Sequence, residues 1–214
     1  NHVNGVGTYS FKFVVTDQAG LVSNEETMAI DLASVNDLPE TDPKALNVNE
    51  DEVLTITLTG SDVEGDVLKF KLVGDVSNGG LSLNSDGSSP LSTNSEIVAS
   101  GNAATIYYKG NLNYNGAESF TYIAVDNENA EDASAATVSV TVDAVNDSPT
   151  AISLSANDVD EYLTSGQTIG AVTVTDVDNA SHTLTVDDTR FEIVSGDLRL
   201  KSGVALDFET EPTI

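Results

Sequence analysis

The sequence of 214 residues contains no cysteine and no tryptophan. Without cysteine no disulfide can stiffen the fold, although disulfides are the usual staple of small extracellular domains. Basic residues are also scarce, with 8 Lys and Arg against 35 Asp and Glu, for a formal net charge of -27. Because phosphate binding needs a basic surface, this balance excludes nucleic acid as a partner and disfavours anionic membranes.

Long apolar runs and catalytic motifs are missing as well. No apolar stretch approaches the roughly 18 residues that a membrane span needs, so we expect no membrane insertion. No signal peptide opens the chain and neither end resembles a natural terminus, so we expect any export signal outside these residues. His2 and His182 stand alone, without zinc spacing, which favours surface roles. With no Ser-His-Asp order, no nucleophile elbow and no evident sugar cleft, we predict that the protein is not an enzyme.

The surplus of acids needs an explanation of its own. Self-repulsion on this scale destabilises a compact chain unless salt screens it or bound cations neutralise it. Disorder is the third explanation for an acidic chain, but the regular strand patterns argue against it. Carboxylates are the ligands that hard divalent cations prefer, so calcium is the candidate that also replaces the missing disulfides.

Alternation with a period of two dominates the chain. "TYSFKFVVTD" puts Tyr9, Phe11 and Phe13 on one face, and "VLTITLTG" puts Leu54, Ile56 and Leu58 on one face. Residues of the Thr, Val, Ile and Tyr type suit a pleated surface, and Gly, Asn, Asp and Ser clusters separate the runs. This rhythm predicts an all-β sandwich. The adjacent Tyr107 and Tyr108 must face opposite sides, one in the core and one available for a ligand.

An internal repeat predicts the domain organisation. "SFKFVVTD" from Ser10 matches "SFTYIAVD" from Ser119, and "VNDLP" from Val35 matches "VNDSP" from Val145, at offsets of 109 and 110. Residues 37–146 are therefore predicted to form one complete unit. Residues 1–36 are predicted to be the last two strands of a preceding unit, and residues 147–214 the opening strands of a following unit.

The two partial pieces together have nearly the length of one repeat. An isolated half-sandwich exposes an open sheet edge, which invites pairing with another strand. One hypothesis is that the ends of neighbouring chains complete one sandwich by strand addition. The alternative is that the partial units only reflect where the fragment was cut.

Short acidic motifs recur at fixed places in these units. The last unit has "VDE" from Val159, "TDVD" from Thr175 and "LDFE" from Leu206, and the linkers read "VND". The sequence resembles the cadherin and bacterial cadherin-like or Ig-like repeats of giant surface adhesins. The resemblance implies tandem Greek-key β-sandwiches joined by calcium-binding linkers. In the middle unit "SDVEGD" from Ser61 has Glu64 in place of the second Asp, and "LNYN" from Leu112 has two amides in place of two acids. The second departure argues against a full set of ions at the lower end of this unit.

The resemblance also implies which residues bind Ca²⁺. The first junction would use Asn36, Asp37, Asp62, Glu64 and Asp126. The second would use Glu50, Asn146, Asp147, Asp176 and Asp178, with Asp51 or Glu52 as further candidates. Asp17 would serve the preceding unit, and Glu161, Asp207 and Glu209 a third junction. Each acid has a structural interpretation too, because Asx side chains bond their own backbone in turns. We favour that interpretation for Asp66, Asp51 and Glu52, and a solvated loop for the acids that follow Asp126.

Three functions are compatible with this sequence. The first is a calcium-rigidified extender segment of an extracellular adhesin on a bacterial surface, whose partners are neighbouring repeats or another surface protein. The second is a subunit of an extracellular filament or surface layer, assembled from neighbouring copies by strand complementation. The third is a cadherin-like module that binds a polysaccharide. Polymer formation would favour the second, and retention on a polysaccharide gel the third.

Overall fold

The structure is a computed structural model that describes residues 7–33, 35–161, 163–207 and 209. All regular elements in these ranges are β-strands. The chain divides into two compact units, Asn1–Ala144 and Val145–Ile214. Among the described residues no helix has the length and apolar character that a membrane crossing requires.

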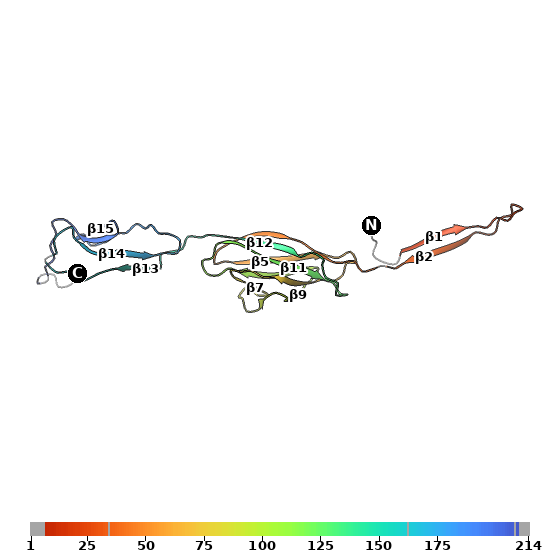
Figure 1. The fold of residues 1–214 in the computed structure, drawn as a ribbon, viewed down its shortest axis with the longest axis horizontal. Coiled ribbons are helices and arrows are strands. Elements are labelled where there is room, and N and C mark those ends of the chain that lie inside the picture. Colours follow the sequence, from red (N-terminus) through yellow and green to blue (C-terminus); the bar gives the residue numbers. More distant parts are fainter. Residues whose placement is uncertain (1–6, 34, 162, 208, 210–214) are drawn as a thin grey trace. The chain divides into compact units, whose positions relative to one another are not determined.

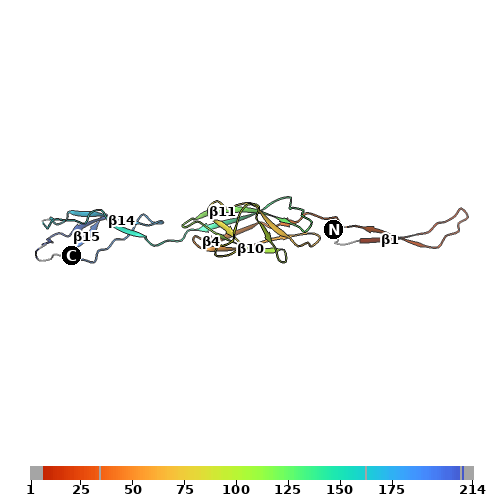
Figure 2. The ribbon, with the colours of Figure 1, turned by 90° about the horizontal axis from the view of Figure 1, so that it is seen from below.

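A two-sheet sandwich, here called the middle sandwich, occupies residues 36–143 (Figure 1). The strands of its first sheet, in order, are β3 (Glu40–Thr41), β5 (Val53–Ser61), β10 (Ala103–Lys109), β7 (Gly80–Ser82) and β8 (Pro90–Leu91). Those of the second sheet are β4 (Lys44–Asn49), β12 (Ala136–Asp143), β11 (Gly116–Val125), β6 (Lys69–Gly74) and β9 (Glu96–Val98). Figure 2 shows β4 and β11 of one sheet and β10 of the other from a second side.

The core of the middle sandwich lies between the two sheets. In β5, Ile56 and Leu58 are buried while Thr55 and Thr57 are exposed, as the alternation predicts. The eight residues of β12 alternate strictly between buried and exposed. Phe70 and Tyr122 meet edge to face, with ring centroids 5.5 Å apart, in the geometry that aromatic pairs prefer. The predicted all-β sandwich class is confirmed.

Buried polar groups of the middle sandwich are satisfied by specific bonds. The Tyr122 hydroxyl donates to the Asp42 carbonyl at 2.7 Å. The Glu118 carboxylate, 8% exposed, accepts bonds from the backbone N–H groups of Ser77 and Asn78. These bonds tie β11 to segments far away in the sequence, so the ends of the strands are held in fixed positions.

An antiparallel hairpin precedes the middle sandwich. It consists of β1 (Gly7–Phe13) and β2 (Glu26–Leu32), and we call it the N-terminal hairpin. Phe11 lies opposite Met28, and Tyr9 lies opposite Ile30. Because directly opposite residues share a face of a sheet, these four side chains lie on one side.

The C-terminal unit, Val145–Ile214, contains one four-stranded sheet. Its strands, in order, are β13 (Ala151–Leu154), β14 (Thr168–Thr175), β16 (Asp197–Leu200) and β15 (Phe191–Val194). All three pairings are antiparallel. In both "VND" segments the first strand begins shortly after the proline, β3 after Pro39 and β13 after Pro149.

Candidate metal sites

Three carboxylates converge where the strands of the middle sandwich end. Asp62 and Asp66 lie in the loop between β5 and β6, and Asp126 directly follows β11. One carboxylate oxygen from each of the three lies within 4.8 Å of the others. Asn36 and Asp37 reach the same place from the segment before β3. Two strand ends and one linker thus supply a cluster of oxygen atoms, here called the Asp126 cluster.

Asp126 is the buried anchor of this cluster, with only 1% of its surface exposed. Its Oδ1 accepts the backbone N–H groups of Glu128 and Ala130, at 2.9 and 2.7 Å. Its Oδ2 accepts the Asn36 Nδ2 at 2.7 Å. Burial raises the pKa of Asp126, but the bond from Asn36 and those from the backbone outweigh burial and hold the pKa below its ordinary value. Asp126 is therefore an anion inside the protein.

Two buried oxygens of the cluster have no hydrogen-bond partner among the described residues. They are Asn36 Oδ1 and Asp62 Oδ2. The carboxylate of Asp126 can only accept, so it fixes the Asn36 amide with the NH₂ toward itself and the oxygen away from it. Asp62 uses its other oxygen, Oδ1, to accept the N–H of Asp66 at 3.1 Å. Buried acceptors without a donor cost free energy, which a cation ligated by them would recover.

The linker and the β5–β6 loop are joined by a further bond. The backbone N–H of Asp37 donates to Glu64 Oε2 at 3.1 Å. Gly65 has φ +80°, a left-handed conformation that lets the loop turn back after Glu64. The loop thus presents Asp62, Glu64 and Asp66 on the side that faces the linker.

The donor set fits a calcium ion by its chemistry. Ca²⁺ takes six to eight oxygen ligands from carboxylates, amide carbonyls and the backbone, with flexible geometry. All five residues predicted for the first junction, Asn36, Asp37, Asp62, Glu64 and Asp126, lie at this cluster. The structure adds Asp66, for which the sequence favoured a role in the turn. The sequence signal for Asp66 is its four-residue separation from Asp62, because the Asp62–Asp66 turn brings both carboxylates to one side.

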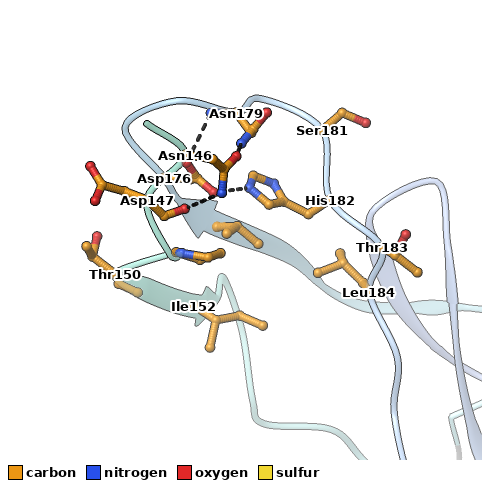
Figure 3. A pocket seen from close by; sticks show the side chains of 13 residues that line it. Asn146, Asp147, Thr150, Ile152, Asp176, Asn179, Ser181, His182, Thr183 and Leu184 are labelled. Carbon is orange, nitrogen blue, oxygen red and sulfur yellow. Dashed lines mark hydrogen bonds and ion pairs between the residues drawn. The ribbon is translucent and has the colours of Figure 1, made fainter. Parts of the chain in front are cut away.

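A second polar group lies at the start of the C-terminal unit (Figure 3). The N–H of Asp147 donates to the Asp178 carboxylate, and the Asn179 amide donates to Asn146 Oδ1. Asp176 Oδ1 accepts the N–H groups of Asp178 and Asn179. Four predicted residues, Asn146, Asp147, Asp176 and Asp178, thus lie in one connected group.

His182 joins this group, contrary to the surface role expected for it. Its Nε2 lies 2.9 Å from Asp176 Oδ2, and Figure 3 shows the ring directed at that carboxylate. The bond with His182 and the N–H groups of Asn179 and Asp178 hold the pKa of Asp176 below its usual value. A cavity of about 730 Å³ adjoins these residues, and Ile152 and Leu184 line its apolar part.

The remaining predicted ligands fall at three other places. Carboxylate oxygens of Glu161, Asp207 and Glu209 lie within 4.8 Å of one another in the C-terminal unit. Glu50 is 4% exposed at the end of β4 in the other unit, Asn1–Ala144. Asp17 Oδ1 accepts the N–H groups two and four residues further on, the same pattern that Asp126 has.

The structure assigns Asp51 a local role. Asp51 has φ +62°, and its Oδ1 accepts the N–H of Asn113 at 3.0 Å. It thereby holds the "LNYN" loop, which agrees with the structural interpretation favoured for it. Of the two adjacent tyrosines, Tyr108 is fully buried in the core, and Tyr107 is half-buried beside a cavity of about 220 Å³.

Comparison with known proteins shows which family and which solved structures the chain is similar to. Residues 36–141 match the family described as bacterial Ig domain. The chain is similar to human CDH23 EC21-23, with 20% identity and a TM-score of 0.60 over 94% of this chain and 66% of that one. It is similar to Protocadherin Gamma B2 extracellular cadherin domains 1-5, with 12% identity and a TM-score of 0.57 over 96% of this chain and 40% of that one.

A further similarity is to PcdhgB3 EC1-4, with 13% identity and a TM-score of 0.56 over 96% of this chain and 59% of that one. The chain therefore spans less than two thirds of the length of each of these solved structures. No curated protein matches it. At these identities the similarity concerns the fold, which is that of cadherin extracellular domains.

Proposed function

Because residues 36–141 belong to the bacterial Ig domain family and share the fold of cadherin extracellular domains, we propose that the chain is a calcium-stiffened extender segment of a bacterial cell-surface adhesin. Bacterial Ig and cadherin-like domains are typically surface-exposed modules with a structural role. The observation that carries the calcium proposal is the Asp126 cluster. There, two buried oxygens without a hydrogen-bond partner among the described residues lie beside converging carboxylates.

The cluster couples the linker to the sandwich. Asn36 already bonds Asp126, and Asp37 already bonds Glu64, so the linker is positioned before any ion arrives. Asn36, Asp62, Asp66 and Asp126 would hold the ion, with Glu64 and Asp37 next to them. When bound, Ca²⁺ supplies positive charge and several ligand positions. The linker would then lose conformational freedom, because its side chain and two strand ends share one ion.

Charge explains why the fold needs the ion. Two unit charges 4.8 Å apart, the upper limit of the separation between these carboxylate oxygens, repel each other by roughly 3.5 kcal/mol at an effective dielectric constant of about 20, before salt and exposure reduce this figure. Three of them in one place destabilise the free cluster. A net charge of -27 adds a general repulsion that bound cations reduce.

The same chemistry extends to the other predicted sites. In the C-terminal unit, Asp176 and Asp178 are presented beside Asn146 and Asp147, and Glu161, Asp207 and Glu209 form a separate group. Glu50 and Asp17 are proposed as ligands at the ends of their own units. The partners of the segment would be neighbouring repeats, and its role would be reach and stiffness rather than catalysis.

Calorimetry of the 214-residue chain in CaCl₂, in MgCl₂ and in EDTA tests this function. Extracellular modules bind Ca²⁺ at roughly 10⁻⁴ to 10⁻³ M, so 10 mM Ca²⁺ stabilises one site by about 1.4 to 2.7 kcal/mol. For a domain of about 100 residues this corresponds to a Tm rise on the order of 6 to 20 °C. Mg²⁺ should give much less, since it demands stricter octahedral geometry. Equal Tm values in CaCl₂ and EDTA would contradict the proposal.

A further inference from the structure

A small cavity lies on the outer face of the first sheet of the middle sandwich. Its volume is about 220 Å³, and outward-facing residues of β7 and β10 line it. Tyr107 lies opposite Ser82, and Lys109 lies opposite Gly80, so these four residues share one face of the sheet. Because Tyr108 between them is buried in the core, this shared face is the outer one. The cavity is therefore open to ligands from solvent.

The missing side chain of Gly80 keeps this cavity open. Apart from its chain neighbours, a Cβ atom at Gly80 would have no heavy atom within 4 Å. At the adjacent Gly79, which has φ +136°, a Cβ atom would collide with the carbonyl oxygen of Lys109. Gly79 is therefore required by the close approach of the two strands. Gly80 is not required by packing, and a larger residue there would occupy the cavity.

The β7–β8 loop, residues 83–89, forms one wall of the cavity and is held by its own hydrogen bonds. The backbone N–H of Leu83 donates to the Ser89 carbonyl at 2.9 Å. The Asn84 amide donates to the hydroxyl oxygens of Ser88 and Ser89, at 2.9 and 3.0 Å. Because these bonds fix the loop before any ligand arrives, binding requires little further ordering of the loop.

Three polar side chains at the cavity have no bonding partner in the described part of the chain. They are the Tyr107 hydroxyl, the Lys109 ammonium and the Asn111 amide. Lys69 and Lys71 of the same sandwich, by contrast, each pair with a glutamate. The cavity thus has one cation and two uncharged polar groups that are available to a ligand.

The charge at the cavity differs from that of the whole chain. None of the described residues that line the cavity is Asp or Glu, although 35 of the 214 residues are acidic. Asp86 lies in the β7–β8 loop but is not among the lining residues. More distant acids act weakly, because the Debye length at 0.15 M salt is about 8 Å. The local charge is therefore that of Lys109, which attracts a negative group on a ligand.

We propose that this cavity binds one acidic sugar residue, a hexuronate unit of an extracellular polysaccharide. The half-buried Tyr107 ring offers apolar surface to the sugar ring, and the Tyr107 hydroxyl and the Asn111 amide bond sugar hydroxyls. Lys109 bonds the carboxylate in a charge-assisted hydrogen bond. The cavity is smaller than the roughly 300 to 1,000 Å³ of drug-sized pockets, so it takes a single ring.

The mixture of polar groups favours a sugar acid over an acidic peptide. A glutamate or aspartate side chain would engage Lys109 but would leave the Tyr107 hydroxyl and the Asn111 amide without a role. A hexuronate has both a carboxylate and several hydroxyls, so it uses all three groups. Because no ligand of this site is a carboxylate of the protein, binding requires no calcium and is independent of the proposed extender function.

An NMR titration of the full ¹⁵N-labelled chain with a galacturonic acid oligomer tests the proposal. EDTA is present, so that calcium cannot bridge carboxylates of the oligomer and the protein. We expect amide chemical shifts to change in residues 79–89 and 107–111. A galactose oligomer of the same length should bind about tenfold more weakly, because it lacks the charge-assisted bond to Lys109.

Two variants with matched controls test the binding residues. Lys109→Gln should weaken binding of the acidic oligomer about tenfold, whereas Lys69→Gln, which removes the same charge from the other sheet, should not. Gly80→Val fills the cavity and should abolish the shift changes. Its control, Ser139→Val, adds a side chain of the same size at an exposed position of β12 and should bind like the wild type.

Several results would overturn the proposal. One is a wild type whose shifts in these two segments do not respond to the acidic oligomer, and another is equal effects of the variants and their controls. Equal affinity for the galactose oligomer would show that Lys109 does not select a charged sugar. Equal affinity for poly-glutamate would show that a carboxylate alone is recognised. An unchanged calorimetric transition of the middle sandwich shows that each variant is folded.

Discussion

Asp62→Asn is predicted to have opposite effects on stability with and without calcium. Without calcium, Asp62 Oδ2 is a buried acceptor with no hydrogen-bond partner among the described residues, and carboxylates of Asp66 and Asp126 lie within 4.8 Å. The asparagine oxygen can still accept the Asp66 N–H, as Asp62 Oδ1 does at 3.1 Å. The new NH₂ group would face two carboxylates, so repulsion becomes attraction. After solvent screening we expect a gain of about 1 kcal/mol in EDTA.

With calcium the variant loses part of its binding energy. At 100 times its Kd, Ca²⁺ stabilises the wild type by about 2.7 kcal/mol. If the lost carboxylate raises Kd tenfold, this stabilisation falls to about 1.4 kcal/mol. In EDTA the Tm of the variant should therefore be higher than that of the wild type. When calcium is added, its Tm should rise by about half as much as that of the wild type.

Scanning calorimetry in 10 mM CaCl₂ and in EDTA measures how Asp62→Asn changes the stability with and without calcium. Asp86→Asn is the matched control, because Asp86 lies exposed in the β7–β8 loop and its Oδ1 accepts the N–H of Ser88 within that loop. This control also removes one negative charge, but at a site outside the Asp126 cluster. It should leave the calcium-dependent Tm shift unchanged. Equal calcium shifts in Asp62→Asn and the wild type would refute the reasoning, as would a variant that is less stable than the wild type in EDTA.

Two further predictions concern other buried carboxylates. Bonds from Asn36 and the backbone hold the pKa of Asp126 below its ordinary value, so its stabilisation is present above the unfolded pKa of about 3.9 and is lost as pH falls through the lower folded pKa. In EDTA the Tm of the wild type should fall steeply below about pH 4, whereas Asp126→Asn should start lower at pH 7 and show a flatter profile; parallel profiles would contradict this. Glu118→Gln replaces one acceptor oxygen by an NH₂ donor, which would face the N–H of Ser77 or of Asn78, and should cost about 1 to 3 kcal/mol. Because Glu118 lies outside the Asp126 cluster, calorimetry should give the same loss in CaCl₂ and EDTA, and a loss that calcium abolishes would contradict the assignment.

The strands of the middle sandwich could be predicted from the sequence because each strand buries one face. The alternation of Ile56 and Leu58 with threonine requires a pleated strand with one side in the core, and the structure has it. The alternation pattern does not always correspond to a strand in the structure. Leu184 and Val186 alternate with threonine too, yet 182–186 forms no strand. A strand also needs a partner for its backbone groups, and the alternation pattern cannot provide one.

The Asp126 cluster could be predicted only in part. The linker and loop residues followed from the resemblance to known repeats, because each has a fixed place in the motif. Asp66 and His182 were not predicted, since both depend on how a loop folds back. Asp66 reaches the cluster through its turn with Asp62, and His182 reaches Asp176 because the chain bends between them, at 177, 178 and 180. Local sequence specifies the ligand types, whereas the turn decides which oxygens converge.

The most direct test of calcium binding is a crystal structure grown in millimolar CaCl₂, with anomalous differences recorded at a long wavelength. We predict a calcium peak between Asn36 Oδ1 and Asp62 Oδ2, with carboxylate oxygens of Asp66 and Asp126 in its coordination sphere. Metal–oxygen distances should be about 2.3 to 2.6 Å. A peak-free cluster in which water molecules donate to these two oxygens would contradict the account.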